Sequence, residues 1–287
     1  MNFFKTRFAW AAYIIGAALL FLYVLFPSEL AEQYLANMIR QMHPNLTMEI
    51  GRLKVGFPPA VKLYDVSIYH SGRNIADLEN VKISPHLLSL FLATTHISFK
   101  GSGYGGNFKG DVDIIKKADD REIVNDADLA GIQVNQLEAL REFTTHRLSG
   151  ILDGTVTLTI QAPQQALTGD LILTDGKIEL SPTLLAQREL TFDSIEAQLR
   201  FNGHSLTIEH CELIGNQLDG EVAGSIRLSN HSSSKILDLT GNVRPNAELL
   251  ARLGNQVPKL LENKNLQTQG VPFKIKGTMD SPTYSFY

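Results

Sequence analysis

The chain has little cysteine, little tryptophan and no strong excess of charge of either sign. It contains a single cysteine, Cys211, among 287 residues. An intrachain disulfide and a zinc site of the CxxC type are therefore excluded. Lysine and arginine total 26 against 30 acidic residues, a balance that argues against nucleic-acid binding. With 44% hydrophobic and 20% charged residues, the composition is that of a folded protein of about two domains or one large β domain.

Long hydrophobic runs are also scarce, because only Phe8 to Phe26 forms one. At 1.5 Å per helical residue, such a run spans about 30 Å, the thickness of a bilayer's hydrocarbon core. Lys5 and Arg7 precede it, so the positive-inside rule places residues 1–7 in the cytoplasm and the rest across the membrane. A cleaved signal peptide is the alternative, but the exit Phe26-Pro27-Ser28-Glu29 lacks a small-x-small cleavage site. We expect one uncleaved anchor over 8–26.

Residues 28–43 predict a short amphipathic helix. Ser28 can cap it, Glu29 and Glu32 lie in its first turn, and Pro44 ends it. The apolar residues between them recur at helical spacing. Such a helix either lies on the membrane surface or closes the end of the sheet that follows, and we favour the second interpretation.

From residue 44 to 287 the apolar residues alternate with a period of two, which predicts strand after strand with one apolar and one polar face. Glycine pairs punctuate these strands in the manner of hairpin turns: Asp153-Gly154, Asp175-Gly176, Asn202-Gly203 and Asp219-Gly220. Helical patterns are few and short: Pro85 to Leu92, Val134 to Phe143 and Ala247 to Leu261.

The predicted fold is mainly β. A single transmembrane helix is followed by one β-rich domain over 44–287, an elongated, folded-over antiparallel sheet forming a groove or sandwich, with a few short helices. The short helices cannot cover all the apolar strand faces, so these faces form a closed core or an open groove that holds lipid. The candidate lining is Val156, Leu158, Ile160, Leu171, Leu173, Leu199 and Phe201.

No motif predicts catalysis, a cofactor or a metal. Gly101 to Gly106 matches G-x-G-x-x-G, but a strand pattern rather than a helix follows, which favours a glycine hairpin. His204 and His210 lie about 20 Å apart on an extended strand, with Cys211 on the other face, too far for one ion. Asp111 and Asp113 share a face and could serve acid–base chemistry, but a solvated surface is the simpler interpretation. We therefore expect a protein that is not an enzyme.

Several segments in order along the chain carry a family resemblance. They are Phe26-Pro27-Ser28-Glu29-Leu30, Ile50-Gly51-Arg52-Leu53, Phe57-Pro58-Pro59-Ala60-Val61-Lys62-Leu63, Ser84-Pro85-His86-Leu87-Leu88-Ser89-Leu90, Tyr104-Gly105-Gly106, Leu148-Ser149-Gly150, Val271-Pro272-Phe273 and Gly277-Thr278-Met279-Asp280-Ser281-Pro282. The order resembles the type II secretion system protein N family (GspN) over nearly the whole chain. The closing segment is also similar to the end of AsmA- and TamB-type envelope proteins.

The resemblance implies a bacterial inner-membrane protein with most of its chain in the periplasm. It further implies a non-catalytic accessory component of the type II secretion system, which supports protein export by binding other secretion proteins. The AsmA and TamB likeness implies the alternative, a β-groove that binds or transfers phospholipid. Neither implication brings catalytic residues to this chain.

Overall fold

The structure is a computed structural model. It describes residues 45–56, 60–86, 88–89, 92–116, 121–138, 140, 147–161, 164–184, 187–228, 235–246, 249, 270–279 and 281–286. The expected anchor over 8–26, with Lys5 and Arg7, and the expected helix over 28–43 lie outside these ranges. Within them, no helix is long and apolar enough to cross a membrane. The chain divides into two compact units after Pro85, and each is described by itself.

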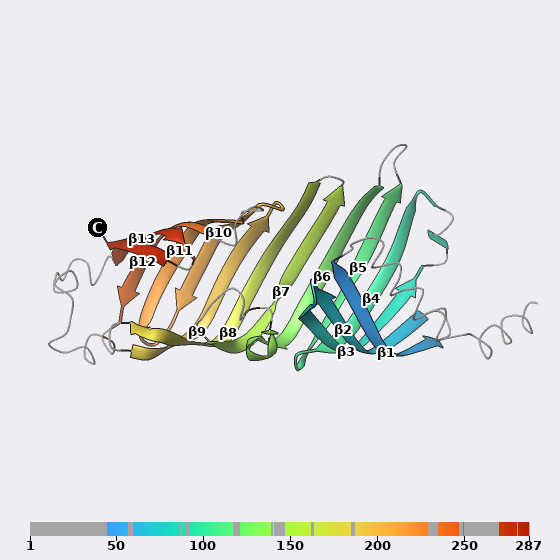
Figure 1. The fold of residues 1–287 in the computed structure, drawn as a ribbon, viewed down its shortest axis with the longest axis horizontal. Helices are drawn as coiled ribbons and strands as arrows, with labels where there is room; N and C mark the ends of the chain where they lie inside the picture. The colour runs from blue at the N-terminus through green and yellow to red at the C-terminus, as the bar shows by residue number, and fades with distance from the viewer. Residues whose placement is uncertain are drawn as a thin grey trace, which may run out of the picture. The chain divides into compact units, whose positions relative to one another are not determined.

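The first unit contains strands β1 (Leu46–Gly56), β2 (Ala60–His70) and β3 (Arg73–Pro85). Both neighbouring pairs are antiparallel, and Figure 1 draws them in blue to teal. Alternate residues share one face of such a sheet, and this places Leu53, Leu63 and Val66 together in a buried cluster. Partly buried aliphatic side chains from all three strands pack against that cluster.

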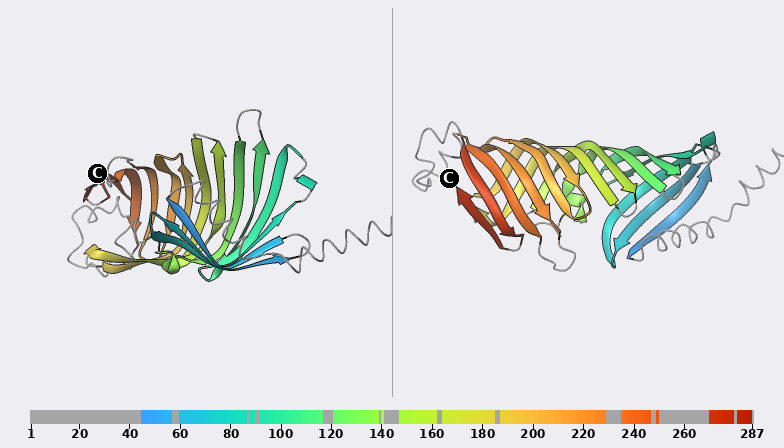
Figure 2. Two further views of the ribbon diagram at one scale, coloured as in Figure 1. Left: turned by 45° about the vertical axis from the view of Figure 1, so that its right-hand side comes forward. Right: turned by 90° about the horizontal axis from the view of Figure 1, so that it is seen from above.

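The second unit is a meander in which each strand pairs antiparallel with the next one in the sequence (Figures 1 and 2). Its strands are β4 (Thr94–Gly103), β5 (Gly106–Lys116), β6 (Arg121–Gln133), β7 (Arg147–Gln161), β8 (Gln164–Leu184), β9 (Gln187–Phe201), β10 (Ser205–Ile214), β11 (Leu218–Arg227), β12 (Ile236–Pro245), β13 (Val271–Thr278) and β14 (Ser281–Phe286). The predictions of a mainly β fold, antiparallel pairing and few helices are confirmed.

Only one of the four glycine pairs predicted as turns connects two strands. Asn202-Gly203 joins β9 to β10, with φ of 84° at Gly203, as a tight turn requires. The other three predictions were wrong, because Asp153-Gly154, Asp175-Gly176 and Asp219-Gly220 lie inside β7, β8 and β11. At Gly154 glycine is needed within the strand itself, because φ is 151° and a Cβ there would overlap the Asp170 carbonyl oxygen and lie 2.9 Å from Leu171 Cα.

The described parts of the predicted helices contain 3-10 turns. Pro85 is the last residue of β3 and not the first of a helix, and of the residues described after it, Leu88 and Ser89 lie in a 3-10 turn. The helix predicted from Val134 begins there but is a 3-10 helix, η2 (Val134–Gln136). The segment predicted over 247–261 lies outside the described residues except at Leu249, which is buried.

A bulge bends strands β7, β8 and β9. The pairing of β7 with β8 shifts between Ser149 and Ile151, and Asp175 adopts a φ of 51°. A bulge inserts an extra residue on one strand and turns it sharply. Beyond this point the hairpin of β8 and β9 runs along the lower edge of the view in Figure 1. Lys177 Nζ and Glu189 Oε2, 2.7 Å apart, tie its two strands together.

Candidate functional site

The register of the second unit aligns its apolar side chains in rows across the strands. Residues directly opposite one another in an antiparallel pair point to the same face. We call the face of β4–β13 that carries the following three rows the apolar face. The first is Ile97, Val112, Asn125, Leu158, Leu167, Phe201, Leu206, Ile226, Leu237 and Gly277; the second is Phe99, Gly110, Ala127, Val156, Gly169, Leu199, Ile208, Gly224, Leu239 and Ile275; the third is Gly101, Phe108, Leu129, Gly154, Leu171, Ala197, Cys211, Val222, Gly241 and Phe273.

All seven residues predicted as lining lie on this face. Val156, Leu158, Leu171, Leu199 and Phe201 belong to its three rows. Ile160 lies beyond the first row, opposite Ile123, and Leu173 lies beyond the third row, opposite Leu152. None of the seven side chains is fully buried.

The side chains of the three rows are mostly partly buried, and some side chains beyond the third row are buried. Within the three rows, Leu237 and Gly169 are the only buried residues. Ile132 and Val271, beyond the third row, are 6% and 3% exposed, and Phe192, further along on β9, is 3% exposed. This pattern differs from a sealed core, whose central residues would be the most buried.

Sequence reasoning missed the contribution of strands outside β7–β9. Phe99 and Phe108 on β4 and β5 lie 6.3 Å apart between ring centroids. The ring of Phe99 covers Gly110, and Phe273 covers Gly241 in the same way. The signal was present as an aromatic residue and a glycine at matching strand positions, but only the register reveals that they are opposite.

Cys211 lies on the apolar face because of a bulge in β10. The pairing with β11 shifts between Ile208 and Cys211, so both residues face the same way despite an odd separation. Cys211 is therefore opposite Ala197 and Val222. Burial raises the pKa of its thiol above the ordinary value, since an apolar setting disfavours the thiolate.

The opposite face of the same strands is mostly polar, although Ile172, Ile214 and Ile236 are exposed on it. Thr157 Oγ1 donates to Asp126 Oδ1 at 2.6 Å, and Lys109 Nζ lies 3.4 Å from Asp128 Oδ2. Asp111 accepts from Ser98 Oγ at 2.6 Å, while Asp113 contacts His96 Nδ1. The two aspartates are thus held by neighbours on an exposed surface, in line with the solvated-face interpretation.

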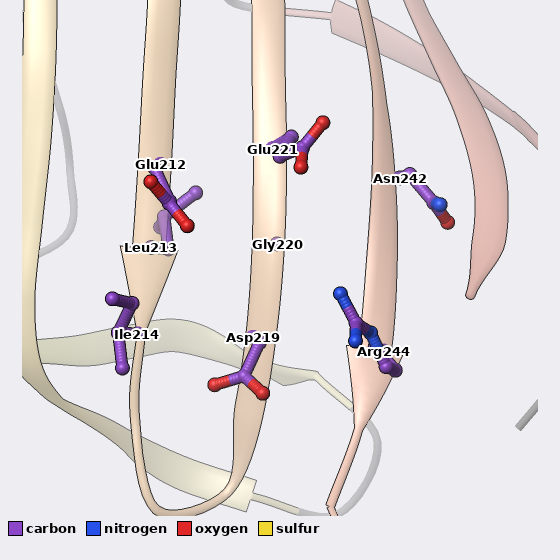
Figure 3. A pocket seen from close by; sticks show the side chains of 8 residues that line it. All are labelled: Glu212, Leu213, Ile214, Asp219, Gly220, Glu221, Asn242 and Arg244. Carbon is purple, nitrogen blue, oxygen red and sulfur yellow. The ribbon is translucent and has the colours of Figure 1, made fainter. Parts of the chain in front are cut away.

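A hollow of about 280 Å³ opens between β10, β11 and β12 (Figure 3). Glu212 lies opposite both Glu196 and Glu221, which forms a row of three glutamates across β9–β11. Asp219 lies opposite Arg244, and its carboxylate accepts from the Gly215 N–H at 3.1 Å. Three of the eight lining residues of the hollow are acidic, and Arg244 is its one basic residue.

The remaining motifs form no metal or nucleotide site in the described structure. Tyr104 and Gly105 make the turn between β4 and β5, with φ of 56° and 74°, so the hairpin interpretation of the glycine-rich segment is confirmed. His204 and His210 are exposed. Among the residues whose positions are described, no three potential ligands gather around a common point.

Comparisons of the chain with models of protein families, with curated proteins and with solved structures give no match. The apolar face therefore has to be interpreted from its own chemistry.

Proposed function

We propose that the protein binds lipid acyl chains on the apolar face of β4–β13. In this proposal it is a non-enzymatic, single-pass protein of the bacterial inner membrane, with its β-rich part in the periplasm. The observation that carries the proposal is that three apolar rows, interrupted by Asn125 in the first, are only partly buried in the described structure. Contiguous exposed apolar surface is uncommon on soluble proteins and usually marks an interaction site.

The energetics favour a flexible apolar ligand. Each exposed apolar Å² costs about 25 cal/mol, and each methylene buried from water contributes about 0.8 kcal/mol. The rows alternate small and large side chains, as in Gly154, Leu171 and Ala197, so their surface is uneven. A flexible acyl chain can follow such a surface. The polar opposite face, with its hydrogen bonds and ion pairs, is suited to water. A sheet with these two faces could shield acyl chains between membranes.

A second function is supported by the order of the sequence segments that resemble the protein N family. In that case the protein is an accessory component of the type II secretion system, and its partners are other secretion proteins. The polar face would then be the contact surface, since its exposed charges, such as those around Glu212, can bind complementary groups.

Adjacent residues on one strand provide the test. Leu171 points to the apolar face, and Ile172, 42% exposed, points to the polar face. A photo-crosslinking amino acid is placed at either position of the full chain in living bacteria whose phospholipids carry radioactive phosphate. We expect labelled lipid on the protein cross-linked from 171 and little from 172.

The second function predicts the reverse pattern. Protein adducts from position 172, identified by mass spectrometry as secretion components, with no lipid from 171, would replace the first proposal with the second. Equal lipid labelling from both positions would indicate contact with the membrane in general and would contradict binding on the apolar face.

A further inference from the structure

Asn125, on β6, interrupts the first row of the apolar face. It is the one amide side chain among the three rows, and it lies opposite Val112 on one side and Leu158 on the other. The adjacent positions of β6 on the same face, Ile123 and Ala127, are apolar too. Every near neighbour that the register gives Asn125 on this face is therefore apolar.

The amide of Asn125 lacks a hydrogen bond that it could make. Its Oδ1 is shielded from solvent and accepts no hydrogen bond in the described structure. A shielded polar atom without a partner lowers stability, and native proteins contain few of them. Rotation about the last torsion angle exchanges Oδ1 and Nδ2, so the amide can make the bond as donor or acceptor. Because its neighbours on this face are apolar, the partner has to come from outside the chain.

A lysine lies on the same face at the end of the neighbouring strand. By alternation along β5, Val112, Ile114 and Lys116 share the apolar face. Lys116 is exposed, and as the last residue of β5 it lies about 13 Å along the strand from Val112. The apolar face therefore has an amide within its first row and a positive charge at its rim, on neighbouring strands.

We propose that Asn125 binds the ester end of a phospholipid and that Lys116 lies toward the phosphate of the same molecule. An ester carbonyl accepts a hydrogen bond from an amide N–H, and an ammonium group binds phosphate. Glycerol separates the ester and the phosphate by a few bonds, and the lysine side chain spans the remaining distance. The acyl chains then extend over β7–β13, where the rows are longest.

This inference rests on the proposed binding of acyl chains and adds two properties to it. The first is the class of lipid, because an amide in the row favours a ligand that carries ester groups over a pure hydrocarbon. The second is direction, because the polar end lies at β5 and β6 and the chains point away from them. Both properties depend on side chains of the described strands.

Leucine at position 125 tests the amide. Asn125→Leu completes the apolar row, and Asn107→Leu is the matched control, because Asn107 is exposed on the other face of β5. Two probes with the same pyrene group, a diacylglycerol and an alkane, are titrated into the full chain in one detergent. We expect Asn125→Leu to weaken binding of the diacylglycerol about fivefold and not that of the alkane. Asn107→Leu should change neither affinity.

A smaller substitution covers the case in which leucine does not fit. Asn125→Ala adds no volume and also removes the amide, so it should show the same loss of preference for the diacylglycerol over the alkane. Because the result is a ratio of two affinities for one variant, competition from the detergent and small losses of folded protein cancel.

Glutamine at position 116 tests the charge. Lys116→Gln should weaken binding of a phosphatidylglycerol probe about threefold at low salt, and the difference should shrink as salt is added. It should not weaken binding of the diacylglycerol, which has the esters and no phosphate. Lys109→Gln is the control, because Lys109 lies on the polar face of the same strand, and it should leave both affinities unchanged.

An unchanged preference for the diacylglycerol in Asn125→Leu and Asn125→Ala would overturn the inference and leave the binding of acyl chains in place. Water would then be the partner of the amide. Equal loss of phosphatidylglycerol binding in Lys116→Gln and Lys109→Gln would remove the assigned direction. If the unaltered chain binds no probe and position 171 labels no lipid, the proposed function fails and the inference fails with it.

Discussion

Gly110 shows at the residue scale how large side chains fit on the apolar face. A Cβ at Gly110 would overlap the Asp126 carbonyl oxygen and lie 2.6 Å from Phe99 Cζ and 3.0 Å from Ala127 Cα. At Gly169, in the same row, the nearest contact of a Cβ would be Thr155 O at an ordinary 3.6 Å. Gly110 therefore has no room for a methyl group, and Gly169 does.

Gly110→Ala should lower the free energy of unfolding by about 1–3 kcal/mol, because Phe99 and the neighbouring backbone must move. Gly169→Ala should be neutral or raise it by about 0.5–1 kcal/mol, because alanine loses less backbone freedom on folding. Thermal unfolding of the full chain in detergent, followed by circular dichroism, compares them. Equal destabilisation by both substitutions would contradict this account of the row.

Cys211 predicts a reactivity that depends on pH. Because burial raises its pKa, less thiolate is present at a given pH than for an ordinary cysteine. Alkylation should therefore be slow near pH 8 and should accelerate only at higher pH. A cysteine placed at the adjacent, exposed position of His210, in a Cys211→Ala background, gives the reference. A faster rate at Cys211 than at 210 would be inconsistent with its position on the apolar face.

At the residue scale, alternation alone was enough to place the seven candidate residues on one face, while their role as the lining of a groove or core stays a prediction. The seven candidate residues share a face because each lies on a strand with unbroken alternation near it. Cys211 shows the limit, since the bulge between Ile208 and Cys211 changes the parity of the strand. The sequence contains no strong local signal for that bulge.

At the scale of the element, the bend in β8 depends on Asp175. Its φ of 51° lies in the left-handed region, which aspartate tolerates and β-branched residues do not. Asp175→Val should lower stability by about 1–2 kcal/mol, and Asp175→Gly should leave it nearly unchanged. Chemical denaturation of the full chain separates the two variants. A neutral valine substitution would mean that the bend does not need this conformation.

The row of glutamates on β9, β10 and β11 predicts a second effect at this scale. Glu212 has a glutamate opposite it on both sides, and like charges directly opposite are unfavourable. Glu212→Gln should therefore raise the melting temperature at low salt, and the gain should shrink as salt screens the charges. Glu209→Gln is the contrasting change, because Glu209 Oε1 lies 2.8 Å from Arg200 Nη2. A gain from both variants would point to net charge and not to the row.

Turns were the least predictable elements. Aspartate followed by glycine is typical of a hairpin turn, yet Asp153-Gly154 lies in the middle of β7. Glycine serves two purposes in this sheet, a reversal of the chain at Gly203 and space for a neighbour at Gly154. A local sequence window contains no information on which neighbour will lie opposite, so it cannot separate the two.

At the scale of the whole molecule, the expected orientation in the membrane has a direct test. Lys5 and Arg7 should keep residues 1–7 in the cytoplasm, so an exposed cysteine at position 172 should lie in the periplasm. In a Cys211→Ala background, Ile172→Cys should react with a maleimide that cannot cross the inner membrane. Adding Lys5→Glu and Arg7→Glu should reduce that labelling. Labelling only after the cells are broken would place the sheet in the cytoplasm.

The fold class of the molecule could be predicted because antiparallel sheets record their two faces in alternating sequence. The division after Pro85 could not, because no polar linker marks it and the sequence there predicts only a short helix. The sequence also left open whether the apolar face forms a closed core or an open groove. Alternation shows which side chains share the apolar face, but it does not show whether another layer covers that face.

The sequential order of β4–β14 has a consequence for how the protein is made. Within β4–β14, consecutive strands hydrogen-bond to one another, so every hairpin can close as soon as its second strand is available. Loop closure over such short separations carries a small entropic cost. A chain delivered from its N-terminus could therefore add strands one at a time to an existing edge, without waiting for a distant segment to arrive.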